Sequence, residues 1–434
     1  MISYLLKKLG YGLLVLLGVV SLVFFVFNLK PGDPARMVAG QKITPELIQA
    51  IERNLNLDLP IIQRFGIYLN DISPVSIHNE ADETSRIFLD ESKYSYTKLF
   101  PVGGENALVI KAPYLNRSFQ SKRSVSSIIS QALPGTLILA VVSIVFALII
   151  GVFGGVIAAL NKDKWIDKLI LILSVIGMSG PSFFMAILVA WIGGLLWFNS
   201  IPLPIIPFII AAGLFVYFLV RENRREASSK LFSMRSVRAV VKAIIIGFGM
   251  WLGLVLLVSI FSLGDWVYWS LSLPGTGLDM TGSLYSLDEW EGLYLNPRNL
   301  ILPALTLGVR PLGVVVQLTR SSLLDILKQD YIRTARAKGL SENKVVYKHA
   351  LRNALNPVIT AVSGWFASML AGAVFVEFVF GWKGLGLEIF NALEKEDFPV
   401  VMGAVLVISF MFVILNILVD VLYGLVDPRV RVRS

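Results

Sequence analysis

Residues 132–160 read ALPGTLILAVVSIVFALIIGVFGGVIAAL, an apolar run without a charged side chain. A helix needs about 20 consecutive apolar residues to cross the hydrocarbon core of a bilayer. This run is long enough to do so, and it is longer than most apolar helices in the core of a soluble domain. The stretch therefore predicts a transmembrane helix.

Seven more apolar runs of comparable length lie on either side of it. They are Leu5–Leu29, Leu169–Phe198, Ile201–Val220, Ala239–Leu263, Leu300–Leu318, Val358–Phe380 and Phe398–Leu425. The first begins with basic residues, as a signal peptide does, but its length and the lack of an A-x-A-like cleavage site indicate a retained anchor. Three prolines shorten the fourth run, which leaves a re-entrant segment as an alternative. We predict an all-α membrane protein with about eight spans.

The composition narrows the possible chemistry. The 434 residues are 55% hydrophobic and only 16% charged, whereas soluble domains carry about 25% charge. Cysteine is absent, which excludes disulfides and thiolate metal sites, and His78 and His349 lie far apart. The phosphate-binding pattern G-x-x-x-x-G-K-[ST] is also absent. We therefore expect no metal, cofactor or catalytic site in this chain, and no ATP hydrolysis by it.

The net charge of +9 is unevenly distributed along the chain. If the N-terminus is cytoplasmic, the loops rich in Lys and Arg all lie inside. These segments are Met1–Lys8, Asn161–Lys168, Arg221–Lys242, Thr319–Asn356 and Asp427–Ser434. The short outer loops Gly264–Pro297 and Gly381–Glu396 carry mainly acids. Because basic residues accumulate on the cytoplasmic side, we expect both termini there, and the charge does not indicate a nucleic-acid partner.

The region between the first two spans is polar enough to lie outside the membrane. Thr44, Pro45 and Glu46 are a typical helix start, and a second helix is expected from Leu59-Pro60. The acidic stretch Ser76–Ser95 is expected to be a loop or insertion. The resulting organisation is 1–29, first helix; 30–131, outer region; 132–198, two helices; 199–263, inserted helix pair; 264–299, outer loop; and 300–434, the remaining helices.

The basic loop at 319–356 has a pattern of its own. Ser321 or Ser322 can cap a helix that continues to Tyr331, and Gly339 is a natural helix stop. Ser341 can cap a second helix that ends before Pro357. The spacing fits a helix, a glycine turn and a helix at the inner membrane surface. It fits equally well a solvated basic loop near anionic lipid.

Four motifs in the same order resemble the dipeptide/oligopeptide ABC transporter permease family. They are Leu29–Pro34, the loop Tyr331–Gly339 with His349–Pro357, Glu377–Gly386, and Val419–Tyr423 with Asp427–Arg429. The resemblance covers the chain except two apparent insertions, at about 73–111 and 199–262. It implies a six-helix type I importer permease core, with the inserted helix pair in addition. We expect that pair to pack against the outside of the core.

The resemblance also assigns a role to the basic loop, which matches the family's EAA loop. In the family this loop is a coupling helix that docks into a cleft of a cytoplasmic ATPase. The corresponding residues here are Tyr331, Arg333, Thr334, Ala335, Arg336, Ala337, Lys338 and Gly339. Small Ala335, Ala337 and Gly339 suit a close contact. Arg333 and Arg352 depart from the general pattern, which has Glu and Pro there, so an acid-based contact is not carried over.

The family further implies partners and a location. A transporter of this kind has two ATPase subunits that bind ATP and magnesium, a second permease that forms a heterodimer with the first, and an extracytoplasmic binding protein. The chain would be a multi-pass protein of the bacterial inner membrane, in contact with lipid, and a transport subunit instead of an enzyme. Peptides are the expected substrate, and nickel chelates or glutathione are alternatives in the same family. A stand-alone secondary transporter would show internal repeats, which the sequence lacks, and the spans show no residue cluster of a membrane enzyme.

Three ionisable residues lie within predicted spans: Arg310, Glu377 and Asp420. Charges at this depth are costly, so each should face the bundle interior or a water-filled cavity. Arg310 either pairs or snorkels, or it lies on the substrate path. Glu377 is expected at a gate or helix contact near the outer end, and Asp420 is expected to be structural. Two G-x-x-x-G patterns, Gly151/Gly155 and Gly249/Gly253, mark close helix contacts or are incidental.

Overall fold

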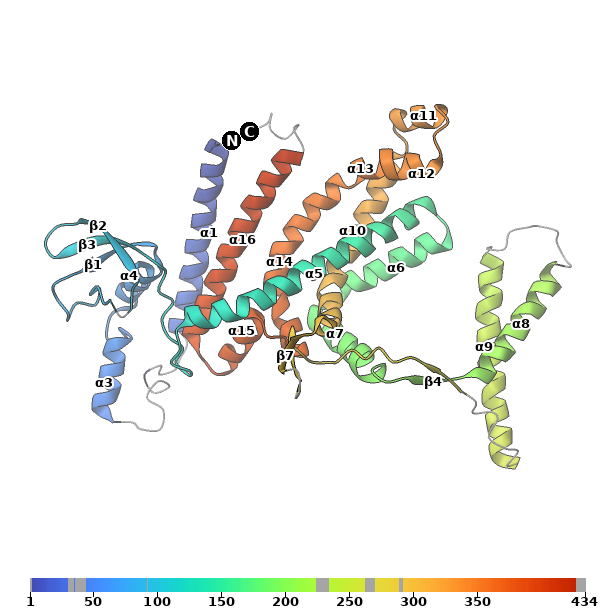
Figure 1. Ribbon diagram of the computed structural model, residues 1–434, viewed down its shortest axis with the longest axis horizontal. Helices are drawn as coiled ribbons and strands as arrows, with labels where there is room; N and C mark the ends of the chain where they lie inside the picture. The colour runs from blue at the N-terminus through green and yellow to red at the C-terminus, as the bar shows by residue number, and fades with distance from the viewer. Residues whose placement is uncertain are drawn as a thin grey trace.

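The computed structural model describes residues 2–29, 35, 44–91, 93–223, 234–261, 270–288 and 292–426. The central bundle contains α1 (Ile2–Leu29), α5 (Val125–Leu160), α10 (Ile301–Ile326), α14 (Asn356–Phe380) and α16 (Phe398–Val426) (Figure 1). In these described ranges five helices are each long and apolar enough to cross a membrane: α1, α5, α10, α16 and one helix of the inserted region. The number rises to seven if each of two bent helix pairs, one of which is α14, is counted as one span. The predicted all-α membrane class is confirmed, and the count of about eight spans stays a prediction.

The predicted third span is not one helix. Leu169–Phe198 divides into α6 (Trp165–Ser179), α7 (Ser182–Val189) and the π-helix η1 (Ala190–Leu196), with a bend of 112° between the two halves. The break falls at Gly180-Pro181. Proline lacks an N–H donor and disfavours helical geometry in the residue before it, so the helix ends there.

The most extensive helix contact in the bundle is that of α5 with α10, and glycines allow the two helices to approach closely. A Cβ on Gly155 would lie 2.5 Å from Cβ of Thr319, and one on Gly151 would lie 2.7 Å from Val315. Both glycines therefore serve close packing, as small residues at this spacing do in membranes. Neither Gly249 nor Gly253 has an atom within 4 Å of its added Cβ among the described residues, so the second G-x-x-x-G marks no such contact there.

The outer region combines helices with a small sheet. The predicted helices are present as α3 (Pro45–Asn54) and α4 (Ile61–Ile72). The strands β1 (Val75–Asn79), β2 (Tyr96–Pro101) and β3 (Asn106–Lys111) form an antiparallel sheet in the order β1-β3-β2. The prediction of a loop from Ser76 was wrong for β1. Alternation explains the strand, because Ser76 and His78 are buried while Val75 and Ile77 are exposed.

The inserted pair stands apart from the bundle (Figure 1). It consists of α8 (Ile205–Asn223) and α9 (Met234–Phe261), which pack mainly on each other. They are joined to the core by the antiparallel ribbon of β4 (Ile201–Pro204) and β5 (Ser270–Leu273). The expectation that the pair packs against the outside of the core was wrong. The ribbon holds the pair at a distance from the bundle (Figure 1).

Shorter elements complete the two ends of the bundle. At one end lie the hairpin of β6 (Tyr285–Asp288) and β7 (Gly292–Leu295), the 3-10 helix η3 (Pro297–Leu300) and the unpredicted helix α15 (Leu385–Glu394). At the other end lie α11 (Asp330–Ala337), α12 (Glu342–Lys344), the π-helix η4 (Val345–Ala350) and α13 (Leu351–Ala354). The start of α1 and the end of α16 point to the same side as α11 (Figure 1).

Candidate functional site

The basic loop forms a knob that projects from the bundle, with α11 at its tip (Figure 1). The predicted helix from Ser321 is instead the last part of α10, which continues to Ile326 before α11 begins at Asp330. Continuity is favoured because Leu323 is fully buried under the knob and anchors this last turn. The predicted glycine turn and a helical segment starting at Ser341 are both present.

One side of α11 packs against the rest of the knob. Ile332 and Ala335 are buried in a cluster with Leu323, Val345 and Ala350. Ala335 was expected at the contact face for an ATPase, whereas its side chain packs into this cluster, and its part in coupling stays a prediction. Its position one turn after Ile332 directs it inward, because residues three apart lie on one helix face.

The other side of α11 is exposed. It presents Tyr331, Arg333, Thr334, Arg336, Ala337, Lys338 and Gly339. Gly339 has φ of +75°, a left-handed conformation that ends helices at low cost only for glycine and a few others. Of the three small residues expected at a contact, Ala337 and Gly339 remain on the free surface.

Polar bonds hold the knob in shape. Arg336 pairs with Glu342 across the glycine turn, with Nε to Oε1 at 2.8 Å. Asn353 Nδ2 donates to the Tyr331 hydroxyl at 2.9 Å, which ties α11 to α13. Together with the buried cluster, these bonds give a compact and rigid projection.

A buried ion pair lies at the base of the knob. Arg320 of α10 donates from Nε and Nη2 to both carboxylate oxygens of Asp167, each at 2.6 Å. Asp167 is 2% exposed in its side chain and also accepts the backbone N–H of Asp163. The pair fastens the start of α6 to α10. Sequence reasoning missed it because the two residues are 153 positions apart.

A polar strip follows one face of α10. Arg310, Gln317 and Ser321 are spaced by seven and four residues, so they lie on one face of the helix. Arg310 and Ser321 are exposed, and Gln317 is half-buried. The guanidinium of Arg310 lies over the ring of Trp365 of α14, at 5.9 Å from its centroid.

The neighbouring face of α14 is polar or small as well. Thr360, Gly364 and Ser368 are exposed at successive four-residue intervals. By contrast, the exposed side chains of α1, α5 and α6 are mainly Leu, Ile, Val and Phe. In the described part of the chain, the adjoining faces of α10 and α14 therefore form a surface poorly suited to lipid. We call these six residues the α10–α14 polar face.

Glu377 lies in a different setting, at the outer end of α14. It is fully buried, and its carboxylate accepts the hydroxyl of Thr136 at 2.6 Å and the backbone N–H groups of Gly386 at 2.7 Å and Leu387 at 3.1 Å. The last two are free donors at the start of α15, so Glu377 caps that helix from another element. Of the two roles expected for Glu377, the geometry shows the helix contact. The side chain of Asp420 falls outside the described part.

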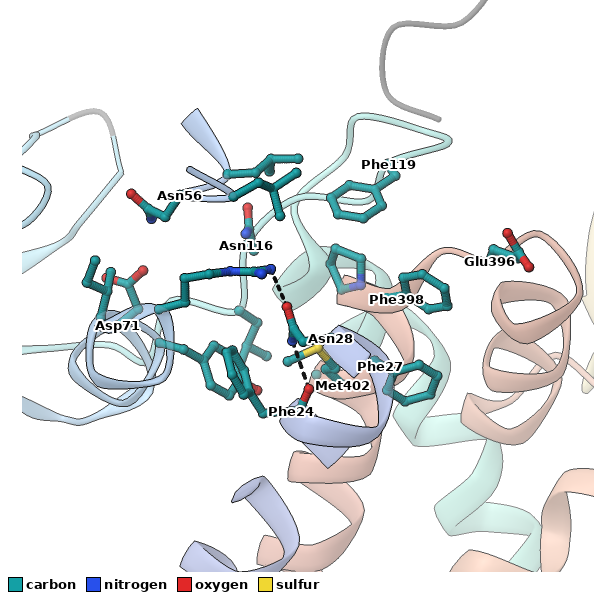
Figure 2. A pocket seen from close by; sticks show the side chains of 18 of the residues that line it. Phe24, Phe27, Asn28, Asn56, Asp71, Asn116, Phe119, Glu396, Phe398 and Met402 are labelled. Carbon is teal, nitrogen blue, oxygen red and sulfur yellow. Dashed lines mark hydrogen bonds between the residues drawn. The ribbon is translucent and has the colours of Figure 1, made fainter. Parts of the chain in front are cut away.

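A cavity of about 370 Å³ opens where the outer region meets α1 and α16 (Figure 2). Phe24 and Asn28 of α1, Arg64 of α4 and Phe398 of α16 line it. Arg64 donates to Asn28 Oδ1, and burial lowers the pKa of the Arg64 guanidinium. The cavity lies at the edge of the bundle, away from α10, and its polar link joins the outer region to the first helix.

Comparison with known proteins adds a family match. The model described as "Binding-protein-dependent transport system inner membrane component" matches residues 151–239 and 234–432. The model described as "Binding-prot-dependent transport system membrane comp, N-term" matches residues 1–140. The two segments of the first match meet inside the inserted region 199–263 that separates the α6–α7 pair from the outer loop.

Individual relatives align over nearly the whole chain. A dipeptide transport system permease protein of Alkalihalophilus pseudofirmus is 28% identical over 435 residues, covering 99% of this chain and 100% of the relative. A di/tripeptide transport system permease protein of Pseudomonas aeruginosa is 28% identical over 433 residues, covering 99% of each. A glutathione transport system permease protein of Escherichia coli is 29% identical over 432 residues, again covering 99% of each.

Proposed function

The chain belongs to the family of binding-protein-dependent transport system inner membrane components, and we propose that it forms half of a translocation path for small peptides. As a family member it is a multi-pass inner-membrane permease subunit of an ABC importer, not an enzyme. Such a system includes a substrate-binding protein and ATPase partners. We further propose two ATPase subunits and one distinct second permease as its stoichiometry.

The substrate class is inferred from the relatives. Permeases for dipeptides, di- and tripeptides and glutathione are all similar to this chain over its full length. These substrates share a peptide backbone with an ammonium and a carboxylate group. Small peptides are therefore the substrate we favour, and glutathione, itself a tripeptide, is the alternative in the same family.

The exposed face of α11 carries the proposal that the knob is the ATPase-coupling element. A docking knob must be rigid and must present exposed side chains to its partner. The buried cluster and the Arg336–Glu342 pair provide rigidity, and Tyr331, Arg333, Thr334, Ala337 and Lys338 are presented outward. ATP and magnesium would bind to the partner ATPases, since this chain has no phosphate-binding loop.

The orientation of the chain follows from the same proposal. If α11 meets a cytoplasmic ATPase, the start of α1 and the end of α16 are cytoplasmic too, because they point to the same side (Figure 1). The distribution of Lys and Arg supports this orientation independently.

Substitution of Ala337 by tryptophan tests the coupling role. The added indole would hold the ATPase surface away from α11, and overpacking of this kind costs about 1–3 kcal/mol. Ala337 is the better site than Gly339, where any bulky residue would also strain the backbone at φ +75°. We expect Ala337→Trp to abolish uptake and ATPase co-purification while membrane insertion is unchanged.

The matched control is Lys162→Trp, which adds the same bulk to the exposed α5–α6 turn on the same side of the bundle. That variant should assemble and transport like the wild type. If Ala337→Trp transports peptide normally at normal expression, the knob does not dock the ATPase and the loop is a lipid-facing basic surface.

A further inference from the structure

Arg310 is a cation within a membrane span that no carboxylate of the described side chains neutralises. It lies nine residues after the start of α10, or roughly 13 Å along the helix axis. No ion pair of Arg310 occurs among the described residues, and its side chain is exposed. A guanidinium at this depth is costly unless it meets water or an anion.

Two buried carboxylates of the bundle, Asp167 and Glu377, already accept hydrogen bonds from other groups. Both oxygens of Asp167 accept from Arg320, and the oxygens of Glu377 accept from Thr136, Gly386 and Leu387. Neither carboxylate is available to Arg310. The described residues therefore leave the Arg310 guanidinium with free donors and one stabilising contact, the ring of Trp365.

That contact fixes the guanidinium without using its N–H groups. A cation over an aromatic face is attracted to the ring through its charge, and the in-plane donors stay free for another partner. A planar guanidinium binds a carboxylate through two parallel hydrogen bonds, which makes arginine well suited to this group. Trp365 thus holds the Arg310 guanidinium in place while its N–H groups can still bind a carboxylate.

The surroundings of Arg310 favour a mobile ligand over lipid. Gln317 and Ser321 continue the polar strip for roughly 16 Å from Arg310 along the axis of α10. Thr360, Gly364 and Ser368 of α14, the helix that carries Trp365, are small and exposed, and Thr360 and Ser368 have hydroxyl groups. A path for peptides needs such a face, because it must accommodate many side chains without a tight fit to any of them.

We propose that Arg310 receives the C-terminal carboxylate of the translocated peptide on the α10–α14 polar face. This inference rests on the proposed function. The carboxylate is the group that all linear peptides share, so one fixed arginine can guide substrates of different sequence. Selection among side chains then takes place elsewhere.

Uptake of two peptides by the complete transporter tests this. The probes are tri-alanine with a free carboxylate and tri-alanine amide, each supplied with the binding protein, the second permease and the ATPases. Arg310→Gln should lower the uptake rate of tri-alanine roughly tenfold or more. The same variant should change uptake of the amide less than twofold. The binding protein has the same preference between the two peptides whether the permease is the variant or the wild type, so this preference cancels when the two are compared.

Two further variants complete the design. Arg310→Lys keeps the charge but not the planar fork, so it should restore only part of tri-alanine uptake. Arg298→Gln, which removes an exposed arginine just before α10, should behave like the wild type with both peptides. Basal ATPase activity and subunit co-purification should be normal in all variants, which shows that they fold and assemble.

Three outcomes are decisive. Equal losses for both peptides in Arg310→Gln would mean that the arginine binds an acid of the second permease, and no loss would mean that it does not contact substrate. Either result overturns the inference about Arg310 but does not contradict the proposed function as a peptide permease. If the wild-type transporter takes up neither peptide, the proposed function itself is wrong.

Discussion

Glu377 shows what a single residue contributes that its sequence motif does not reveal. The motif predicts an important carboxylate near the outer end of α14. Its main side-chain partner, Thr136, is 241 positions away, so no local pattern predicts their contact. The structure makes Glu377 the shared acceptor for α5 and the start of α15. Gly384 is required beside it, because an added Cβ would lie 2.4 Å from the carboxylate.

Removal of the Glu377 carboxylate should therefore destabilise the outer end of the bundle. In Glu377→Ala, the Thr136 hydroxyl and two backbone N–H groups lose their acceptor in a buried site, and each unsatisfied donor costs about 1–3 kcal/mol. We expect a loss of about 3 kcal/mol or more in unfolding free energy, measured by thermal unfolding in detergent. Glu394→Ala, which removes an exposed acid from the end of α15, should stay within about 0.5 kcal/mol of the wild type. Equal stability of the two variants would contradict the capping role.

Ala335 is a second residue whose place in the fold its type does not reveal. A small residue in a presumed contact loop suggests a close contact with a partner. The structure instead directs Ala335 toward Leu323 and Val345, and leaves Ala337 at the surface. Residue type alone did not distinguish the two, because the helical phase of α11 depends on where the helix begins. The sequence placed that start at Ser321 or Ser322, whereas α11 begins at Asp330.

At the scale of helices and strands, hydropathy predicted the long spans well and short elements poorly. The runs that became α1, α5, α10, α14 and α16 were found with shifts of a few residues at their ends, because apolar residues predominate along each of them. Helix α15 was missed since it has only 10 residues and three glycines, Gly381, Gly384 and Gly386, lie just before it and in its first turn. The break between α6 and α7 had a local signal, Gly180-Pro181, that hydropathy averages away.

The pairing of α5 with α10 gives a prediction with a built-in control. A methyl group on Gly155 would lie 2.5 Å from Cβ of Thr319 and 2.8 Å from the carbonyl oxygen of Val316. One on Gly154 would meet its nearest atom, in Val316, at 3.5 Å, an ordinary contact. Gly155→Ala should therefore force the helices apart and lose about 1–3 kcal/mol in unfolding free energy.

Gly154→Ala should be neutral or slightly stabilising, because alanine is the better helix former. Thermal unfolding of the two purified variants in the same detergent measures the difference. A loss in Gly154→Ala as large as that in Gly155→Ala would show that helix propensity, not the contact with α10, governs both positions.

At the scale of the whole molecule, the chain combines a permease core with a module on a separate stalk. The distribution of Lys and Arg limits the number of inserted spans: two extra helices, or none, leave the basic loop of the knob on the cytoplasmic side expected from its charge. The structure adds how the pair is attached. The stalk is the two-stranded ribbon β4–β5, in which Pro204 lies opposite Ser270. The sequence did not predict this ribbon, since its strands are four residues long and 65 residues apart.

The cross-strand pairing makes the module removable in principle. Opposite residues of an antiparallel pair have Cα atoms about 5 Å apart, a gap that a two-residue Asn-Gly turn closes. Replacement of residues 205–269 by Asn-Gly should therefore leave a hairpin of β4 and β5 on an intact core. We expect the shortened chain to insert, to bind its ATPase partners and to take up peptide at a rate within about threefold of the wild type. This expectation rests on the few contacts that α8 and α9 make outside their own pair and the ribbon.

Removal of only one helix of the pair is the informative contrast. Without α9 (residues 234–261) the chain has one span fewer before α10, so the basic segment around α11 would have to cross the membrane or α10 would have to be excluded from it. That variant should lose ATPase binding and uptake although it deletes fewer residues. A cysteine placed at Lys328 in this chain, which has none of its own, reports the side directly through an impermeant thiol reagent. Loss of uptake in the longer deletion, with normal insertion, would mean that α8 and α9 take part in transport, and retention of uptake in the shorter one would refute the assigned orientation.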